Sequence, residues 1–425
     1  MVKKSKKALV RQALVVGIDI AKKSHYVQIL DGFGEPFEKP FPVQNTMDGF
    51  QHLEARIKQA KDKLGLTNIV IGCEPTGHYH KPIAHWFMER DYTVVMVGSA
   101  MVKRRKEEPD NSPKKSDPKD AALIAQLISE GKYLNMILPR SEYAELRELT
   151  IIRRQLRETL TRYLNNLAAV LDEFFPEFTS VFKSKTGKAA TWVLRNCPWP
   201  EEILRLSLTE LAENLSKASK KHCGIERAKE LQAAAKRSIG VREGLNSARL
   251  RLNLILDGIE ETERRLADIE AQMAIELEKT GMKESLLSIP GVGVVIAAGF
   301  LGEIGDPRQY DGWRQVHKLA GLNIVSNSSG QHIGKSRISH RGRPGLRCLL
   351  YQATLVMVFR NPQFQALYHY FRTRPQNPLC AKAAMVAVSG KLLRVMMHLA
   401  KTGNLYDPSR VFGHVRESQI GGIAA

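Results

Sequence analysis

The chain has 425 residues, 43% of them apolar, and it carries 64 lysines and arginines against 44 aspartates and glutamates, for a formal net charge of +20. This composition allows buried cores in two or three domains of ordinary size, and it excludes a disordered tail. The five cysteines form no Cys-x-x-Cys pair, which argues against a disulfide framework and a cysteine zinc site, and favours a cytoplasmic protein.

The sequence gives no signal for export or for a membrane span. Its amino terminus is basic, but Asp19 interrupts the first apolar stretch and no small-residue cleavage site follows. No other apolar stretch is expected to reach the roughly 18 to 20 residues of a membrane helix. The sequence therefore predicts a soluble protein without membrane contact.

The positive charge is concentrated near the carboxyl terminus. Between Asp311 and Asp407 there is no acidic residue, whereas the same stretch holds fourteen lysines and arginines. Because nothing there repels a polyanion, we expect nucleic acid as the partner. A solvated face is the alternative, although soluble surfaces normally mix both signs. Membrane-surface binding is disfavoured, because the basic residues are not expected to line one amphipathic helix.

The first 140 residues predict an α/β sheet domain. The expected elements, in chain order, are a strand hairpin over 13–31 with a turn at 21–24, a strand over 68–72, a helix over 77–89, a strand over 93–97, an exposed charged loop over 103–119 and a helix from Asp117 to Ile128. Strands followed by alternating helix and strand are typical of such a sheet.

Residues 141–280 predict a long helical region. Apolar side chains from Leu146 to Val170 recur at helical spacing, and a second series recurs every seven residues, at Leu252, Ile259, Leu266 and Met273. This pattern predicts a helical hairpin or coiled coil. Pairing within one chain and pairing between chains, which would give a dimer or tetramer, both remain open. The segment around Cys197 to Lys221 indicates short helices, and the sequence does not indicate a role for residues 176–240.

A third, mostly helical domain is expected over 281–425. Near its start, the sequence IPGVG sets a turn between two apolar helical stretches and resembles a helix-hairpin-helix, a motif whose backbone amides bind DNA phosphates. We therefore expect Ile289, Gly291 and Gly293 to contact the DNA backbone, although a glycine pair between helices is often only a tight turn.

Four acidic residues of the first domain are candidate metal ligands. Asp19 interrupts an apolar strand, where an unpaired charge is costly, and Glu74 follows the next strand. Asp117 and Asp120, three residues apart, share a helix face, although they also fit an ordinary helix start. Carboxylates gathered at one sheet edge suit one or two Mg²⁺ ions that neutralise a phosphodiester and activate an attacking oxygen.

These residues lie in the segments VVGIDIAKKSHYV, IGCEPTGHYH and KKSDPKDAALIA, which resemble the DEDD tetrad of the Piv-type DNA invertases and the related insertion-sequence transposases known as bridge-RNA-guided recombinases. The resemblance implies that Asp19, Glu74, Asp117 and Asp120 form the tetrad of a RuvC-like domain with an RNase H-like fold. It also implies that a noncoding RNA pairs with both DNA partners.

A second segment, AGLNIVSNSSGQHIGKSRISHRGRPGLRCLLYQATL over 320–355, resembles the carboxy-terminal transposase domain of that family. The resemblance makes Ser329 the nucleophile that joins a DNA phosphate, with Ser328 as the less favoured register, whereas a Ser, Asn and Gly cluster alone would indicate a turn. Nearby cations are expected to hold the phosphate, namely Lys335, Arg337, Arg341, Arg343 and Arg347.

The serine hydroxyl needs a base or a metal, and the candidates are His332, His340 and the metal site of the first domain. The family usually has lysine where this chain has His340. We thus predict a transposase that cuts and rejoins DNA through a Mg²⁺-assisted serine-phosphate intermediate, with DNA and a guide RNA as partners. A junction-resolving nuclease without a covalent intermediate and a noncatalytic DNA-organising protein are the alternatives.

Overall fold

The computed structural model describes residues 10–75, 77–106, 117–329 and 332–413. It does not describe the side chains of Asp117, 326–329, 332, 333 and 335. The chain divides into two compact units, Met1–Leu138 and Pro139–Ala425, so that the helical middle and the carboxy-terminal segment belong to one unit.

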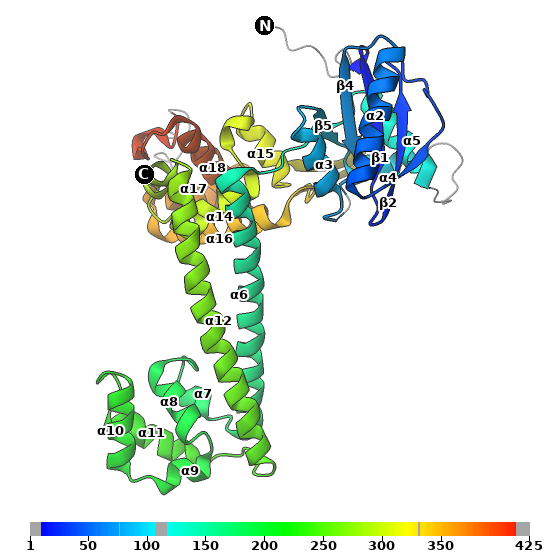
Figure 1. Cartoon of the computed structure of the whole chain (residues 1–425). Coiled ribbons are helices and arrows are strands. Elements are labelled where there is room, and N and C mark those ends of the chain that lie inside the picture. Colours follow the sequence, from blue (N-terminus) through cyan, green and yellow to red (C-terminus); the bar gives the residue numbers. More distant parts are fainter. Residues whose placement is uncertain (1–9, 76, 107–116, 330–331, 414–425) are drawn as a thin grey trace. The chain divides into compact units, whose positions relative to one another are not determined.

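The first unit is built on a six-stranded sheet with the order β3-β2-β1-β4-β5-β6 (Figure 1). The strands β1, β4 and β5 run parallel, whereas β2, β3 and β6 each pair antiparallel with a neighbour. The elements are β1 (Ala13–Asp19), β2 (Ser24–Leu30), β3 (Phe41–Gln44), α2 (Met47–Lys63), β4 (Asn68–Cys73), α3 (His80–Met88), β5 (Thr93–Met96), α4 (Ser99–Lys106), α5 (Asp117–Ser129) and β6 (Leu134–Asn135).

Helices cover both faces of this sheet, because alternate residues of the central strand β1 are buried against different helices. Leu14, Val16 and Ile18 pack in one core with α2 and α3. Ala13 and Val15 pack in the other core with α4 and α5. Ala13, Val15 and Gly17 of β1 are thus on the side of the sheet that α5 covers.

The predicted hairpin, the two further strands and the helix that begins at Asp117 are confirmed. The helix expected over 77–89 is three residues shorter at its start. The prediction of a loop from residue 103 was wrong for 103–106, which belong to α4, and residues 107–116 lie outside the described part of the chain. The sequence prediction also missed α2 and β3.

The second unit contains a hairpin of two long helices, α6 (Ser141–Phe174) and α12 (Leu245–Lys279), which pack side by side within one chain (Figure 1). Tyr163 of α6 lies over Gly258 of α12, where a Cβ atom would come 2.4 Å from the ring. Between the two helices the chain forms a small bundle of short helices, α7 (Phe178–Val181), α8 (Lys188–Asn196), α9 (Pro200–Arg205), α10 (Leu208–Ala218) and α11 (Ile225–Lys236).

The rest of the second unit is mostly helical. Its elements are α13 (Lys283–Leu287), α14 (Val294–Ile304), η1 (Pro307–Gln309), α15 (Trp313–Leu319), β7 (Ile324–Ser329), β8 (His332–Ile338), α16 (Pro344–Arg360), α17 (Pro362–Thr373), α18 (Ala381–Thr402) and η2 (Pro408–Arg410). The helices α14 and α6 are in contact, and α16 packs against both α14 and α18.

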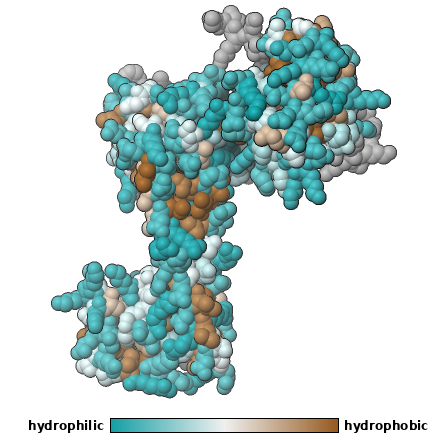
Figure 2. Space-filling view, viewed as in Figure 1, coloured by the Kyte–Doolittle hydropathy of each residue, from teal (hydrophilic) through white to brown (hydrophobic). Residues whose placement is uncertain are grey.

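The helix α18 is long and apolar enough to cross a membrane by length and composition, which the sequence analysis did not expect. About 56% of its apolar window is buried inside the unit, as is typical of a core helix. Figure 2 shows a largely hydrophilic surface with an apolar patch beside the helical hairpin, and α16 exposes Leu355, Val356 and Phe359.

Candidate functional site

The two strand-borne carboxylates stand at the same edge of the sheet. Ile18 and Cys73 are paired in the parallel register of β1 and β4, so that Asp19 and Glu74 are the next residues along each strand. Gly17 and Gly72, two residues earlier, both lie under α5. By the strand alternation of side chains, Asp19 therefore faces α5, and Glu74 does so if the extended backbone continues one residue.

Two glycines bring α5 close to the sheet. A Cβ atom at Gly17 would come 2.4 Å from the backbone nitrogen of Ala125, and one at Gly72 would come 2.5 Å from Cδ1 of Ile128. Ser129, at the end of α5, lies beside Gly34, which follows β2 near the start of β1. The helix therefore runs antiparallel to β1, and its first turn, with Asp120, lies toward the strand end that holds Asp19.

A lysine from α4 pairs with the helix-borne carboxylate. Lys106 Nζ lies 2.6 Å from Oδ2 of Asp120, and both side chains are partly buried. The basic end of α4 also sends Arg105 to Glu130 at 2.7 Å. A carboxylate that binds an ammonium group at this distance is also placed to bind another cation instead.

The described side chains include no group of three or more His, Cys, Asp and Glu residues that is close enough to hold a metal. The side chain of Asp117 is not among the described ones. Cys73 is buried in the core that the sheet forms with α2 and α3, on the opposite side of the sheet from α5. Burial and then the Glu74 carboxylate raise the pKa of its thiol to about 12. The fit to a metal thus rests on carboxylates alone, whose oxygens suit a hard divalent cation.

His25, which the sequence analysis did not consider, supports the turn that follows Asp19. Its ring is fully buried and stacks on Phe50, and Nδ1 accepts a hydrogen bond from the Ala21 amide at 3.2 Å. Burial lowers the pKa of His25, although a hydrogen bond with Asn45 opposes this shift. A polar residue within the apolar strand β2 was the only sequence signal for this role.

Ser329 is the last residue of β7 and pairs in register with His332, the first residue of β8. The two strands form an antiparallel pair with a register irregularity between Val325 and Asn327. The candidate nucleophile therefore lies at the far end of a two-stranded ribbon, and so does Ser328, the alternative register. The ribbon was not predicted, because the sequence indicated only a turn.

Backbone hydrogen bonds in and beside the AGL and IS segments hold the base of this ribbon together. The Ser339 amide donates to the Asn323 carbonyl at 2.7 Å, and the Arg343 amide donates to the Leu319 carbonyl at 2.7 Å. Gly342 is required at its position, because a Cβ atom there would come 2.2 Å from the same Leu319 carbonyl oxygen. These short motifs are thus a local scaffold that presents Ser329.

The predicted phosphate-binding cations fall into two groups. Arg337 and Arg341 are exposed, whereas Arg343 and Arg347 are partly buried and donate to the carbonyl oxygens of Glu303 and Ala320. Burial, followed by the charge of Arg147, lowers the pKa of Arg343. The side chain of Lys335 lies outside the description, and His340 is exposed at a positive φ of 53°.

The predicted helix-hairpin-helix corresponds to α13, a turn and α14. Ile289 is fully buried, so that only its backbone remains for a phosphate contact. Gly291 has a φ of +97° and lies against Met357 of α16, whereas a Cβ atom at Gly293 would meet nothing within 4 Å. Gly293 caps α14 without a side-chain hydrogen bond, which leaves this helix start open to an anion.

Comparisons with known proteins place both candidate regions in transposase families. Residues 16–176 match a DEDD transposase family model of the IS110 type, and residues 283–369 match the transposase family IS116/IS110/IS902. The first match contains the four carboxylates, and the second contains Ser329, the five cations and the glycine turn.

Individual relatives also align with this chain over most of its length and most of their own. A protein named for the IS117 mini-circle of Streptomyces coelicolor is 25% identical over 93% of this chain and 96% of the relative. The uncharacterized protein of insertion element IS110 from the same species is 23% identical over 92% and 95%. The transposase for insertion sequence element IS1111A of Coxiella burnetii is 21% identical over 82% and 78%.

Proposed function

Since the chain belongs to the IS110-type transposases, enzymes that cut and rejoin DNA, we propose that it does so through a serine-phosphate intermediate with the help of Mg²⁺. The main support for this proposal is the common sheet edge that Asp19 and Glu74 share, toward which the first turn of α5 points. The sheet order supports an RNase H-like fold. The strands β3, β2 and β1 pair antiparallel, and β4 and β5 then extend the sheet parallel to β1.

A DEDD-type transposase domain implies a divalent metal catalytic site. Asp19, Glu74, Asp117 and Asp120 would hold this cation, with Lys106 as the group that pairs with Asp120 when no cation is there. When bound, Mg²⁺ would neutralise the phosphodiester and stabilise the charge on the leaving oxygen. The protein's part is to hold these carboxylates in place at the end of β1.

The Ser329 hydroxyl is the proposed nucleophile. Its Oγ forms a bond to phosphorus, a deoxyribose oxygen leaves with a proton, and the Oγ proton passes to a base for which His332 and His340 are candidates. A deoxyribose hydroxyl of the second DNA then attacks the same phosphorus and releases the serine. The number of phosphodiester bonds is unchanged, so that no ATP is consumed.

Nucleic-acid backbone contacts are assigned to the exposed cations Arg337 and Arg341, to Lys335, and to the open helix start at Gly291 and Gly293. Arg343 and Arg347 have a second role here, because their bonds to carbonyl oxygens fix the base of the ribbon. A guide RNA would select the DNA by base pairing, and the protein would then bind mainly backbone shape. We also propose a cytoplasmic location and a homo-oligomer, with residues 141–280 as the helical spacer between the two catalytic segments.

An excision assay on a plasmid-borne element tests the proposal. Asp19→Asn and Ser329→Ala should each lower excision at least about a hundredfold without loss of DNA binding. Asp62→Asn on α2 and Ser180→Ala on α7 are matched controls, since both side chains are exposed and lie outside the site. A nuclease without a covalent intermediate, the second candidate, would retain cleavage in Ser329→Ala and lose it in Asp19→Asn.

A further inference from the structure

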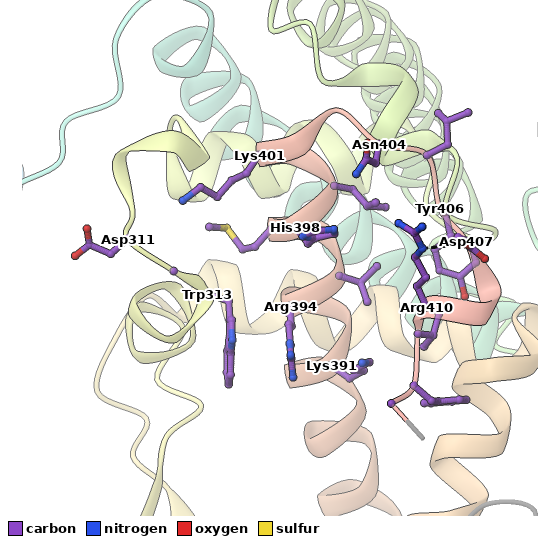
Figure 3. A pocket seen from close by; sticks show the side chains of 18 residues that line it. Asp311, Trp313, Lys391, Arg394, His398, Lys401, Asn404, Tyr406, Asp407 and Arg410 are labelled. Carbon is purple, nitrogen blue, oxygen red and sulfur yellow. Dashed lines mark ion pairs between the residues drawn. The ribbon is translucent and has the colours of Figure 1, made fainter. Parts of the chain in front are cut away.

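The second unit has a cavity of about 660 Å³ that contains none of the candidate site residues (Figure 3). It lies between α18, the start of α15 and the segment that follows α18. Its volume is within the range of about 300 to 1,000 Å³ that is usual for small-ligand sites. The chemistry of its walls therefore indicates what it can bind.

One wall is a basic face of α18. Four side chains spaced by three, four and three residues lie on the same side of this helix, Lys391, Arg394, His398 and Lys401. The opposite side packs into the core through residues such as Val388, Leu392 and Met396. This face holds only three of the fourteen lysines and arginines of the acid-free stretch, so that it does not contradict the expectation for the whole set.

The second wall carries an aromatic ring. Trp313 is partly buried at the start of α15, and the guanidinium carbon of Arg394 lies 5.6 Å from its ring centroid. Figure 3 shows the two side chains next to each other and projecting the same way. His317 meets the indole edge-on, at 5.7 Å between ring centroids, and so fixes the ring. An indole beside an arginine can accept a base by stacking and a phosphate by charge.

The two carboxylates that line the cavity are already engaged. Asp407 pairs with Arg410 at 3.3 Å and accepts hydrogen bonds from Ser409, and Asp311 accepts one from Gln315 at 3.1 Å. The remaining charged lining residues are cationic, so that the cavity favours an anion. Lys401 donates to the Tyr310 carbonyl at 2.5 Å and Lys391 also has a partner within the chain, so that Arg394 is the main phosphate contact.

We infer that this cavity binds an unpaired nucleotide of a single-stranded nucleic acid, with the base against Trp313 and a backbone phosphate against Arg394. The inference rests on the proposed function only in that the partner is nucleic acid. A duplex keeps its bases stacked inside and offers mainly phosphates, so that Trp313 distinguishes a single strand from a duplex. RNA and DNA share this chemistry, and both are tested.

The test measures fluorescence polarisation of short labelled oligonucleotides with the full-length protein, using single-stranded RNA, single-stranded DNA and duplex DNA of matched length. Trp313→Ala and Arg394→Ala should each weaken single-strand binding by about tenfold, whereas duplex binding should change by less than about threefold. Arg372→Ala is the matched control, because Arg372 is exposed on α17, within the same acid-free stretch and outside the cavity. Trp313→Phe keeps a stacking surface and should retain most of the affinity.

Equal losses in Arg394→Ala and Arg372→Ala would overturn the inference, since they would indicate only diffuse attraction. So would unchanged single-strand binding in a folded Trp313→Ala protein, with folding checked by circular dichroism. Stronger loss with RNA than with DNA would identify RNA as the ligand, and the reverse would identify a DNA strand. Asp19→Asn and Ser329→Ala should bind these oligonucleotides normally, so that a failed reaction mechanism and a failed cavity assignment give different results.

Discussion

The ammonium group of Lys106 lies 2.6 Å from Oδ2 of Asp120, and this pair joins the end of α4 to the first turn of α5. Both side chains keep some solvent contact, at 34% and 16% exposure, so that the pair is screened and contributes little to stability. Its significance lies in its position, since Asp120 is one of the four proposed metal ligands.

We predict that Lys106 competes with a divalent cation for Asp120. Lys106→Met should therefore raise the affinity of the protein for Mn²⁺ by about 1.4- to fivefold, because an exposed pair of this kind contributes about 0.2 to 1 kcal/mol. The affinity is measured by titration calorimetry. Lys103→Met removes an equal charge from the exposed side of the same helix and should have no such effect. A lower affinity in Lys106→Met would contradict the competition.

Close packing of α5 on the sheet is needed for both stability and activity. Gly17→Ala places a Cβ atom 2.4 Å from the backbone nitrogen of Ala125, which forces the helix away from β1. We expect the free energy of unfolding to fall by about 1 to 3 kcal/mol and DNA cleavage to fall with it. Urea titration and a cleavage assay measure these effects.

The control for Gly17 is Gly98→Ala, since a Cβ atom there would meet nothing within 4 Å. It should leave both the urea midpoint and the cleavage rate near those of the unmodified protein. If Gly17→Ala behaves in the same way, the helix does not depend on close approach at this glycine.

His25 should make the stability of the first unit sensitive to acid. Burial keeps its pKa below the ordinary value of 6.5, so that the unfolded chain binds a proton more readily than the folded chain. The stabilisation from neutral His25 is therefore complete above about pH 6.5 and is lost as the pH falls toward the folded pKa. We predict that His25→Phe flattens the fall of the urea midpoint between about pH 7 and pH 5.

His52 serves as the control for that measurement, because it is exposed on α2. His52→Gln should leave the dependence of the midpoint on pH unchanged. An identical slope for His25→Phe and the unmodified protein would show that His25 is not the group responsible.

Much of the first unit could be predicted from the sequence, because strand and helix signals there are local. The apolar strands before Asp19 and Glu74 and the helix start at Asp117 are examples. The charge-rich helix α4 was mistaken in part for a loop, since the run of cations hides its helical character. The approach of α5 to Gly17 depends on a tertiary contact that no local pattern indicates.

The exposure of the cations in the second unit also depends on tertiary contacts and could not be predicted from local sequence. From the sequence alone, Arg341 and Arg343 were both expected to bind the phosphate. In the structure Arg341 is exposed, whereas Arg343 donates a hydrogen bond to the Glu303 carbonyl. The basic face of α18 was likewise missed, because it becomes apparent only when the helix and its buried side are known. The role of Ser329 was inferred from family resemblance, and its place at the end of β7 adds only the scaffold that presents it.

Trapping the covalent intermediate tests the central claim most directly. The purified protein is incubated with Mg²⁺ and a nicked DNA substrate from which the leaving strand diffuses away, and the protein-DNA adduct is digested and mapped by mass spectrometry. We predict a phosphate-linked nucleotide on Ser329, with no adduct in Ser329→Ala or Asp19→Asn. Cleaved DNA without any adduct, or an adduct on a residue other than Ser329, would contradict the proposed mechanism.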